Sequence, residues 1–407
     1  MTQTDTRRLI ILGSTGSIGA QTLAVVDHLN DLHARGALPT RYQILALAAG
    51  RNADTLTGQA ARYDVPRLAL ADESVDTDLR CARGPDAAIE LLHSLDLNPE
   101  TDLIVSAMVG VAGLAPTLAA LERGIDVALA NKEPLVAAGD LVTQIARTNH
   151  AALLPIDSEH SAIWQCLVGA RQDHDLVPPL DAPPAGVKRL ILTASGGPFR
   201  DWPADRIAAA TRDQALAHPT WDMGPKITID CASLTNKALE LIEAHHLFAM
   251  PASRLDVLVH PQSIIHSMVE MDDASTLAQL ATTDMRTPIQ LALTHPRRAP
   301  APAPRLDLAS IARLDFEAPD PERFPALACA KRVIERGGTS GAIFNAANEA
   351  AVEAFLADDS ALPFGVIADL TIAALDELEP RPLRTLQDAL DADAEAREFV
   401  SRRLVEA

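Results

Sequence analysis

The sequence predicts an α/β fold with a parallel sheet at its N-terminal end, a second α/β region in the middle and a helical bundle at its C-terminal end. Short apolar runs such as residues 9–12 and 44–48 alternate with helical patterns in the first third, which favours a parallel sheet with helices on both faces. Further apolar runs at 190–193 and 255–260 predict a second sheet. From Phe324 onward the pattern is helical and rich in Ala, Leu and Glu.

The predicted elements follow one another in a regular order. The strands of the first sheet are predicted at residues 9–12, 44–48, 68–70, 103–107, 127–130 and 153–156. Helical patterns between them include residues 17–29, 86–95 and 114–123. The second sheet is predicted from residues 190–193, 255–260 and 264–271. The run of Ala and Pro at 299–304 predicts an extended linker before the C-terminal helices.

The composition narrows the class of partners. The chain has 407 residues, 48% of them hydrophobic, and a net charge of -20. So acidic a chain repels phosphate backbones, so we expect no nucleic acid partner, and a small phosphorylated ligand only in a locally basic pocket. The four cysteines are far apart and form no C-x-x-C pair, which fits a reducing cytoplasm. Because no apolar run is long enough for a membrane span or a signal peptide, we expect a soluble, cytoplasmic protein with no membrane partner.

A glycine-rich turn links the first predicted strand to the first predicted helix. Its sequence is Gly13-Ser14-Thr15-Gly16-Ser17-Ile18-Gly19. Glycines let the backbone approach a pyrophosphate, and the helix N-terminus offers free N–H groups. An ordinary tight turn is the alternative, but the position between a strand and a helix predicts a Rossmann-like dinucleotide site.

The second strand is followed by Gly50, Arg51 and Asn52. A site selective for NAD usually carries an acidic residue here, whereas an arginine can pair with the 2′-phosphate of NADP. The sequence therefore favours NADP. The alternative is that Arg51 is an ordinary solvated surface residue.

Two carboxylates lie together after the strand at 153–156, in Asp157-Ser158-Glu159-His160. In an extended chain, residues two apart point to the same side, so we expect Asp157 and Glu159 to converge at the ligand-binding edge of the sheet. Paired carboxylates suit Mg²⁺ or Mn²⁺. The alternative is a helix start, since Asp and Ser before a helix with Glu in its first turn are common capping residues.

Other polar motifs offer groups for a phosphorylated ligand. A helical pattern brings Asn236 and Lys237 close to Glu240, either as a surface ion pair or as one face of a ligand site. The glycine-rich loop 195–200 offers N–H groups to an oxyanion, or is an ordinary turn. The segment 218–224 places Trp221 in a predicted loop, where it either covers a ligand or packs into a core. We interpret His260 and His266 as hydrogen-bonded structural histidines.

Taken together, these motifs resemble the 1-deoxy-D-xylulose 5-phosphate reductoisomerase family of the non-mevalonate isoprenoid pathway. The matching segments occur in order along nearly the whole chain: GSTGSIG at 13–19, ANKE at 130–133, LLPIDSEH at 153–160, SGGPFR at 195–200, HPTWDMG at 218–224, NKALE at 236–240, HPQSIIHSM at 260–268, DMRTPI at 284–289 and NAANE at 345–349.

The resemblance implies a reaction and a domain plan. The reaction is the rearrangement of the substrate to an aldehyde phosphate, which NADPH reduces to 2-C-methyl-D-erythritol 4-phosphate with the help of Mg²⁺ or Mn²⁺. The plan is an NADPH-binding domain at 1–157, a catalytic and dimerisation domain at 158–294, a linker at 295–320 and a helical domain at 321–407. A homodimer is implied as well.

The resemblance also implies the roles of individual residues. The metal ligands would be Asp157, Glu159 and Glu240, and Lys132 and Glu159 would be catalytic. The NADPH contacts would be Thr15, Gly16, Ser17, Ile18, Gly50, Arg51, Asn52, Asn131, Glu133 and Gly224. The substrate contacts would be Lys132, Ser158, Glu159, Ser195, His218, Cys231, Asn236, Lys237 and Glu240. The family has a serine where this chain has Cys231, and a thiol is a weaker phosphate donor than a hydroxyl.

Two other classes of protein remain as alternatives. Another NADP-dependent dehydrogenase, of the semialdehyde or homoserine type, would share the N-terminal domain but need no added metal. A catalytically silent dinucleotide-binding regulator would bind NADPH but tolerate loss of Glu159 or Lys132.

Overall fold

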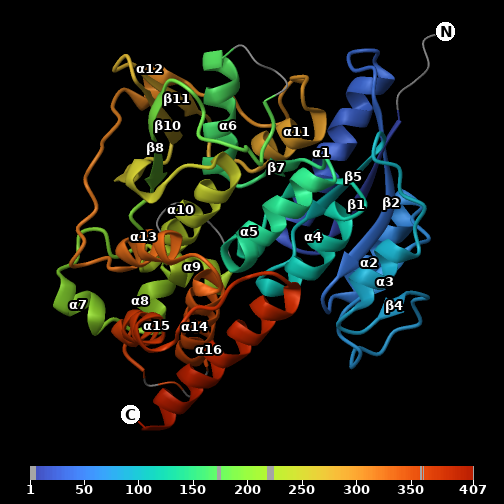
Figure 1. The fold of residues 1–407 in the computed structure, drawn as a ribbon. Coiled ribbons are helices and arrows are strands. Elements are labelled where there is room, and N and C mark those ends of the chain that lie inside the picture. The colour runs from blue at the N-terminus through green and yellow to red at the C-terminus, as the bar shows by residue number, and fades with distance from the viewer. Residues whose placement is uncertain (1–5, 172–175, 218–223, 358–359, 361, 407) are drawn as a thin grey trace.

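The protein is described by a computed structural model that covers residues 6–171, 176–217, 224–357, 360 and 362–406 (Figure 1). The N-terminal sheet, the second sheet and the C-terminal helices pack against one another around one contiguous apolar core. The core continues from strand to helix across all three regions because each sheet face and helix stripe buries its apolar side against a neighbour. Within the described ranges, no helix is both long and apolar enough to cross a membrane.

The first sheet has seven parallel strands in the order β4-β3-β2-β1-β5-β6-β7. Their bounds are β1 Thr6–Leu12, β2 Arg41–Ala49, β3 Leu68–Leu70, β4 Ala82–Arg83, β5 Asp102–Ser106, β6 Asp126–Leu129 and β7 Leu153–Pro155. All six predicted strands are confirmed, and β4 was missed because two residues carry no periodic signal. The chain builds outward from β1 to β4 and then returns to β5 on the other side of β1. The strand order therefore reverses between β1 and β5, where sheets of this kind bind their ligands.

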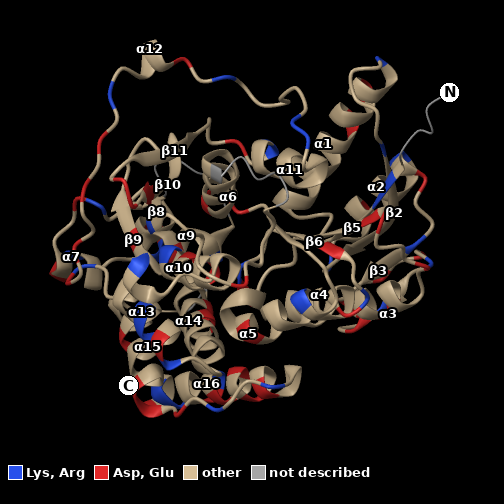
Figure 2. Ribbon diagram, turned by 45° about the horizontal axis from the view of Figure 1, so that its top comes forward, with Lys and Arg blue, Asp and Glu red and all other residues tan. Residues whose placement is uncertain are grey.

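Helices cover both faces of this sheet. The helices between its strands are α1 Ser17–Ala34, α2 Ala53–Tyr63, α3 Ala87–His93, α4 Leu114–Leu121 and α5 Glu133–Thr148. Figure 2 shows α3, α4 and α5 on one side of the strands, with α1 and the later helix α11 (Arg286–Thr294) on the other. The predicted Rossmann-like arrangement is therefore confirmed.

The second sheet has four strands in the order β11-β10-β8-β9. Its strands are β8 Val187–Ala194, β9 Leu255–Val259, β10 Ile265–Met271 and β11 Thr276–Leu280. Strand β8 runs parallel to β9 and antiparallel to β10, and β10 also pairs with β11. The first three were predicted. The sequence did not indicate β11 because it is an edge strand with largely exposed side chains and no apolar run.

Several helices pack around the second sheet. Helix α6 (Ser158–Arg171) packs on β10 and β11, and α10 (Thr235–Phe248) packs against β8, β9 and α5. Three shorter helices precede α10: α7 Ala204–Ala208, α8 Arg212–Leu216 and α9 Pro225–Ala232. Helix α10 thus bridges the first sheet and the second.

The segment between α11 and the C-terminal helices runs along the outside of the second sheet (Figures 1 and 2). It contains the single-turn helix α12 (Leu308–Ile311) and one antiparallel bridge between Glu317 and Val259. Leu314 packs on a small apolar cluster of Ile191, Ile265 and Met268. Residues 299–304, predicted as an extended linker, form no helix or strand, although Ala303 is buried. The segment beyond them is anchored to the second sheet.

The C-terminal region consists of α13 Ala326–Arg336, α14 Ser340–Leu356, α15 Gly365–Glu377 and α16 Leu386–Glu406. Helix α14 lies at its centre and contacts α13, α15, α16 and α5. At Gly341 the approach to α5 is very close, since a Cβ atom built there would lie 1.9 Å from the Val136 carbonyl oxygen. The C-terminal helices therefore pack closely against α5 at a position where only glycine has room.

This contact predicts opposite effects for two glycine-to-alanine substitutions. Gly341→Ala should lower the free energy of unfolding by about 1–3 kcal/mol, because the new methyl group forces α14 away from α5. Gly58→Ala is the matched control: Gly58 also lies in a helix, but a Cβ atom there would meet nothing within 4 Å. It should stabilise the protein by about 0.4–1 kcal/mol through the unfolded chain. Urea unfolding followed by circular dichroism measures both, and equal shifts would contradict the packing argument.

Candidate active site

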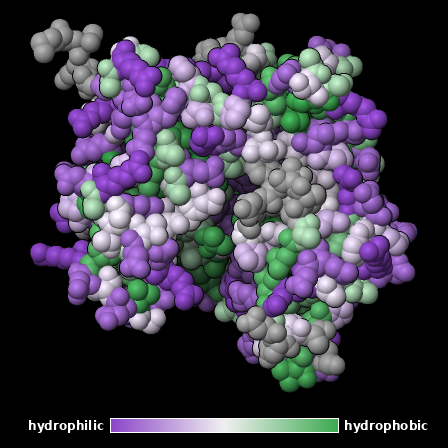
Figure 3. Space-filling model, turned by 180° about the vertical axis from the view of Figure 1, so that it is seen from behind, coloured by the Kyte–Doolittle hydropathy of each residue, from purple (hydrophilic) through white to green (hydrophobic). Residues whose placement is uncertain are grey.

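A cavity of about 560 Å³ lies between the first sheet and the second. Figure 3 shows the molecule hollowed between its two sides, with apolar side chains visible inside the hollow. The cavity receives side chains from the N-terminus of α1, the ends of β6 and β7, the start of α6, and helices α9 and α10. Of the residues predicted as functional, it is lined by Ser17, Ile18, Lys132, Asp157, Ser158, Glu159, Ser195, Gly224, Cys231, Asn236, Lys237 and Glu240.

The glycine turn forms one wall of this cavity. Gly13 follows β1 with φ of 86°, and a Cβ atom there would lie 2.3 Å from the Ala107 carbonyl oxygen at the end of β5. Only glycine combines this dihedral angle with so close an approach. Gly16 is the N-cap residue of α1. Because glycine has no side chain, no side-chain atom at this position accepts a hydrogen bond from the first N–H groups of the helix. Ser17 and Ile18 then begin α1 at the cavity. This is the geometry of an anion-binding helix N-terminus.

The residues after β2 lie at the same edge of the sheet. Arg51 is exposed, and Gly50 beside it leaves open space, since a Cβ atom there would meet nothing within 4 Å. Asn52 caps α2, because its Oδ1 accepts a hydrogen bond of 3.0 Å from the Thr55 N–H. The Asn52 side chain is thus already engaged in local structure. These residues do not line the cavity itself.

Two further predicted cofactor residues are buried beside the cavity. Asn131 follows β6 and accepts a hydrogen bond of 2.9 Å from Ser106 through its Oδ1, while its Nδ2 has no hydrogen-bond partner among the described residues. Glu133 begins α5 and lies 3.4 Å from Lys226 Nζ on α9. Gly224 precedes α9 and does line the cavity.

Three carboxylates converge from separate elements. Asp157 follows β7, Glu159 lies in the first turn of α6, and Glu240 lies on α10. One oxygen from each lies within 4.8 Å of the others. The extended chain expected for Asp157 and Glu159 was wrong, because α6 begins at Ser158, as in the helix-start alternative. The two carboxylates still converge, and a helix start holds them there.

Two lysines neutralise this group. Lys132 Nζ lies 2.5 Å from Asp157 Oδ2 and donates to Glu240 Oε1 and Asn236 Oδ1, at 3.0 Å each. Lys237 Nζ donates to Glu159 Oε1 at 2.7 Å and also contacts Glu240 Oε2. Both ammonium groups are largely buried, so the pairs are not solvent-screened surface bridges.

The charges shift one another's pKa values. Burial opposes the charge of Lys132, but Asp157 and Glu240 outweigh it and hold the Lys132 pKa well above its ordinary value. Burial also raises the pKa of Asp157, yet the Lys132 ammonium brings the net pKa below its usual range. Glu159 behaves differently: burial and the neighbouring Glu240 carboxylate raise its pKa to about 7, although Lys237 opposes this. One carboxyl group of the three therefore retains a proton near neutral pH.

The predicted phosphate donors also line the cavity. Ser195 follows β8, and Asn236 and Lys237 begin α10. Cys231 lines the cavity from α9, and burial raises the pKa of its thiol to about 12, so it presents a neutral S–H group. His218 and Trp221 lie outside the described residues.

Models of known families match this chain along most of its length. The model described as 1-deoxy-D-xylulose 5-phosphate reductoisomerase matches residues 9–139. The model of the C-terminal domain of that enzyme matches 153–248, and the model described as DXP reductoisomerase C-terminal domain matches 280–399. A 1-deoxy-D-xylulose 5-phosphate reductoisomerase from Rhodospirillum centenum is 48% identical over 404 residues, which cover 97% of this chain and 94% of the relative.

This chain belongs to the 1-deoxy-D-xylulose 5-phosphate reductoisomerase family. A second family member, from Symbiobacterium thermophilum, is 46% identical over 96% of this chain and 97% of its own. Solved structures of the family superpose closely. The reductoisomerase from Zymomonas mobilis in complex with NADPH is 42% identical with a TM-score of 0.84, covering 98% of each chain. A reductoisomerase in complex with NADPH, fosmidomycin and magnesium is 37% identical with a TM-score of 0.86, covering 98% of this chain and 99% of its own.

Several residues that line the cavity were not predicted as functional. Thr283, Asp284, Met285 and Arg286 line the cavity just before α11, where Arg286 is held by Asp284 with a bond of 2.6 Å. They lie in or beside the family segment 284–289, but that segment alone carries no chemical signature. His266 also lines the cavity, and burial lowers its pKa to about 4. His260 is structural, as expected, since it contacts the Asp315 carbonyl at 2.8 Å and accepts from the Ile264 N–H.

The raised pKa of Glu159 predicts proton release when a divalent cation binds. A cation needs the ionised carboxylate, whereas the cation-free protein holds a proton on Glu159 below about pH 7. Binding of Mn²⁺ at pH 6 should therefore release close to one proton from this group, and binding at pH 8.5 almost none. The apparent affinity should rise with pH up to about 7 and then level off.

Calorimetry in buffers of different ionisation enthalpy measures this release. Glu159→Gln should bind Mn²⁺ more weakly and lose the pH-dependent release, whereas the exposed Glu90→Gln on α3 should behave like the unmodified protein. Equal proton release at both pH values would show that Glu159 is not the group displaced.

Proposed function

We propose that this chain converts 1-deoxy-D-xylulose 5-phosphate to 2-C-methyl-D-erythritol 4-phosphate with NADPH and a divalent cation, Mg²⁺ or Mn²⁺. This conversion belongs to isoprenoid precursor synthesis by the non-mevalonate route. One observation carries the proposal: a glycine turn for a dinucleotide and three convergent carboxylates face the same cavity. A dehydrogenase without a metal would not need the carboxylates, and a silent regulator would not need them paired with buried lysines.

The residues around the glycine turn fit NADPH. The uncapped N-terminus of α1 suits a pyrophosphate, and the exposed Arg51 at the end of β2 suits the 2′-phosphate. The Asn131 amide is buried with an unpartnered Nδ2, which suits a cofactor polar atom in the crevice. When bound, NADPH supplies the reducing equivalent. We assign Thr15, Gly16, Ser17, Ile18, Gly50, Asn52, Glu133 and Gly224 to the same site.

The carboxylates of Asp157, Glu159 and Glu240 fit a hard divalent cation. All three donors are oxygen atoms, they lie close enough to share one ion, and they come from rigid elements. When bound, such a cation polarises the substrate carbonyl and orients its oxygens. The neighbouring Lys132 is placed to stabilise negative charge that develops on the same oxygens.

Charge balance suggests how the acidic site admits a phosphate. In the cation-free protein, Lys237 Nζ is held by Glu159 and Glu240. A cation that neutralises these carboxylates leaves the lysine free to donate elsewhere. Lys237 then joins Ser195 and Asn236 as a donor to the substrate phosphate, with the Cys231 thiol and Ser158 nearby. We include His218 in this group from the family pattern.

Three further features of the family concern its domains, its assembly and its location in the cell. We propose domain boundaries after residues 157, 294 and 320, a homodimer formed by the central domain, and a cytoplasmic location. The edge strand β11, with its exposed Leu277, supports an association through the second sheet. All four cysteines are free, which supports a reducing compartment.

The function is tested by following NADPH oxidation at 340 nm with 1-deoxy-D-xylulose 5-phosphate. We expect oxidation only when substrate and Mg²⁺ or Mn²⁺ are both present, with 2-C-methyl-D-erythritol 4-phosphate as the product. Glu240→Gln should lower turnover by at least about 100-fold, because it removes one charged donor of the cation. NADPH binding, followed by fluorescence, should stay near normal in this variant.

Glu90→Gln serves as the control and should retain full turnover, since Glu90 is exposed and does not line the cavity. Oxidation that proceeds unchanged in the presence of a chelator would overturn the metal-dependent assignment. Oxidation with an amino-acid semialdehyde instead would favour the dehydrogenase alternative.

A further inference from the structure

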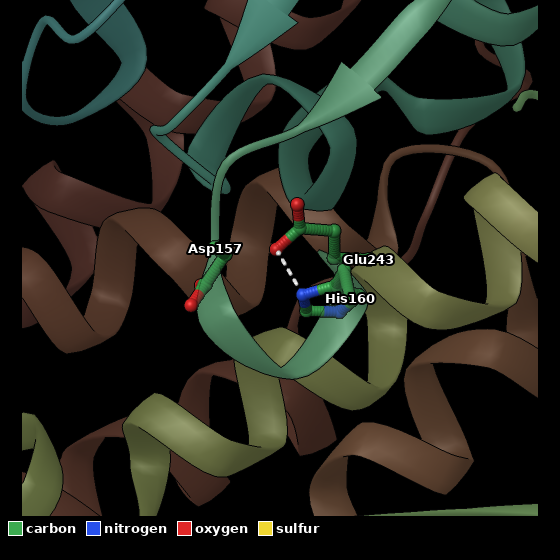
Figure 4. A group of neighbouring side chains, drawn as sticks. All are labelled: Asp157, His160 and Glu243. Atoms are coloured by element: carbon green, nitrogen blue, oxygen red, sulfur yellow. Dashed lines mark ion pairs between the residues drawn. The ribbon is translucent and has the colours of Figure 1, made fainter. Parts of the chain in front are cut away.

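A buried acid–imidazole pair lies behind the three carboxylates. His160 on α6 and Glu243 on α10 are 0% and 1% exposed, and Figure 4 shows their side chains facing each other. His160 Nδ1 lies 3.5 Å from Glu243 Oε2, which is within ion-pair distance, but neither atom makes a hydrogen bond among the described residues. The other ring nitrogen, His160 Nε2, lies 2.8 Å from the main-chain carbonyl oxygen of Glu240.

The hydrogen-bonding capacity of these atoms fixes where the protons lie. A carbonyl oxygen only accepts hydrogen bonds. His160 Nε2 therefore carries a proton and donates a hydrogen bond to the main-chain carbonyl oxygen of Glu240. In a neutral ring, Nδ1 then presents a lone pair toward Glu243. A carboxylate oxygen facing that lone pair would be repelled, and two buried acceptors would remain unsatisfied. One proton between Nδ1 and Oε2 satisfies both atoms.

Burial of both side chains favours placing that proton on Glu243. A neutral carboxylic acid donating to a neutral imidazole places no separated charges in the interior.

We propose that Glu243 is a positioning residue for the cation site: as a neutral carboxylic acid it donates to His160 Nδ1 and so holds the ring that fixes the Glu240 main chain. Glu240 supplies one of the three converging carboxylates from the same turn of α10. The inference rests on the cation site of the proposed function. Outer hydrogen bonds of this kind commonly set the orientation of metal ligands.

A second cation is the competing occupant of this place. Asp157, His160 and Glu243 each offer an atom within 4.8 Å of the others. However, neither His160 nor Glu243 lines the cavity, whereas Asp157 does. A second ion would have to pass through packed protein and would sit beside the first, sharing Asp157. The proton satisfies the same atoms without either difficulty.

Two substitutions at Glu243 separate these possibilities. Glu243→Gln keeps an N–H donor for His160 Nδ1 in nearly the same volume, whereas Glu243→Leu keeps the bulk and removes the donor. Binding of Mn²⁺ to the whole protein is measured by electron paramagnetic resonance, which does not depend on turnover. We expect one Mn²⁺ per chain, an affinity within about twofold of the unmodified protein for Glu243→Gln, and an affinity about 10-fold weaker or more for Glu243→Leu.

Each other outcome overturns the inference. A loss of 10-fold or more in Glu243→Gln would mean that an ionised carboxylate is needed, and this result stands even if Glu243→Leu does not fold. Unchanged affinity in Glu243→Leu would mean that the pair is only packing. Two Mn²⁺ ions per chain, with one lost in Glu243→Gln, would show a second cation site. An unmodified protein that binds Mn²⁺ but does not turn over the sugar phosphate would defeat the proposed function alone.

Discussion

The arrangement of the whole site depends on the mutual neutralisation of buried charges between α10 and the ends of β6 and β7. Asp157, Glu159 and Glu240 would repel one another strongly in so dry a place. Lys132 and Lys237 hold them together in the cation-free protein. A divalent cation can take over this task, which would release an ammonium group for an anionic ligand. The same carboxylates thus account for both metal binding and phosphate binding in an acidic chain.

The fold brings these charges together from distant parts of the sequence. Strands β6 and β7 are parallel neighbours and end at the same edge of the sheet. Lys132 and Asp157, which follow them, therefore lie side by side. Helix α10 packs on α5 and carries Asn236, Lys237 and Glu240 to the same edge. The glycine turn after β1 opens onto the same cavity. The close fit of α14 against α5 at Gly341 ties the C-terminal helices to this frame.

The sequence was sufficient to predict six of the seven strands of the first sheet and the dinucleotide turn, because periodicity and motif spacing are local properties. The set of three carboxylates followed from the resemblance to the family. The sequence could not show that Lys132 pairs with Glu240 across 108 positions, since that contact depends on how α10 packs. It left open whether the backbone at Glu159 is extended or begins a helix, because the same residue types occur in both. Arg286 and the His160–Glu243 pair were missed, because no local sequence pattern marks these residues as part of a site.

The most direct test of this account is the position of a bound cation. Crystals of the protein grown with Mn²⁺ and NADPH, measured at the manganese absorption edge, give an anomalous difference map that locates the ion independently of activity. The account predicts one peak, coordinated by Asp157, Glu159 and Glu240, with Lys237 no longer in contact with Glu159. A peak between His160 and Glu243, or a cation bound while both lysines keep their present partners, would contradict it.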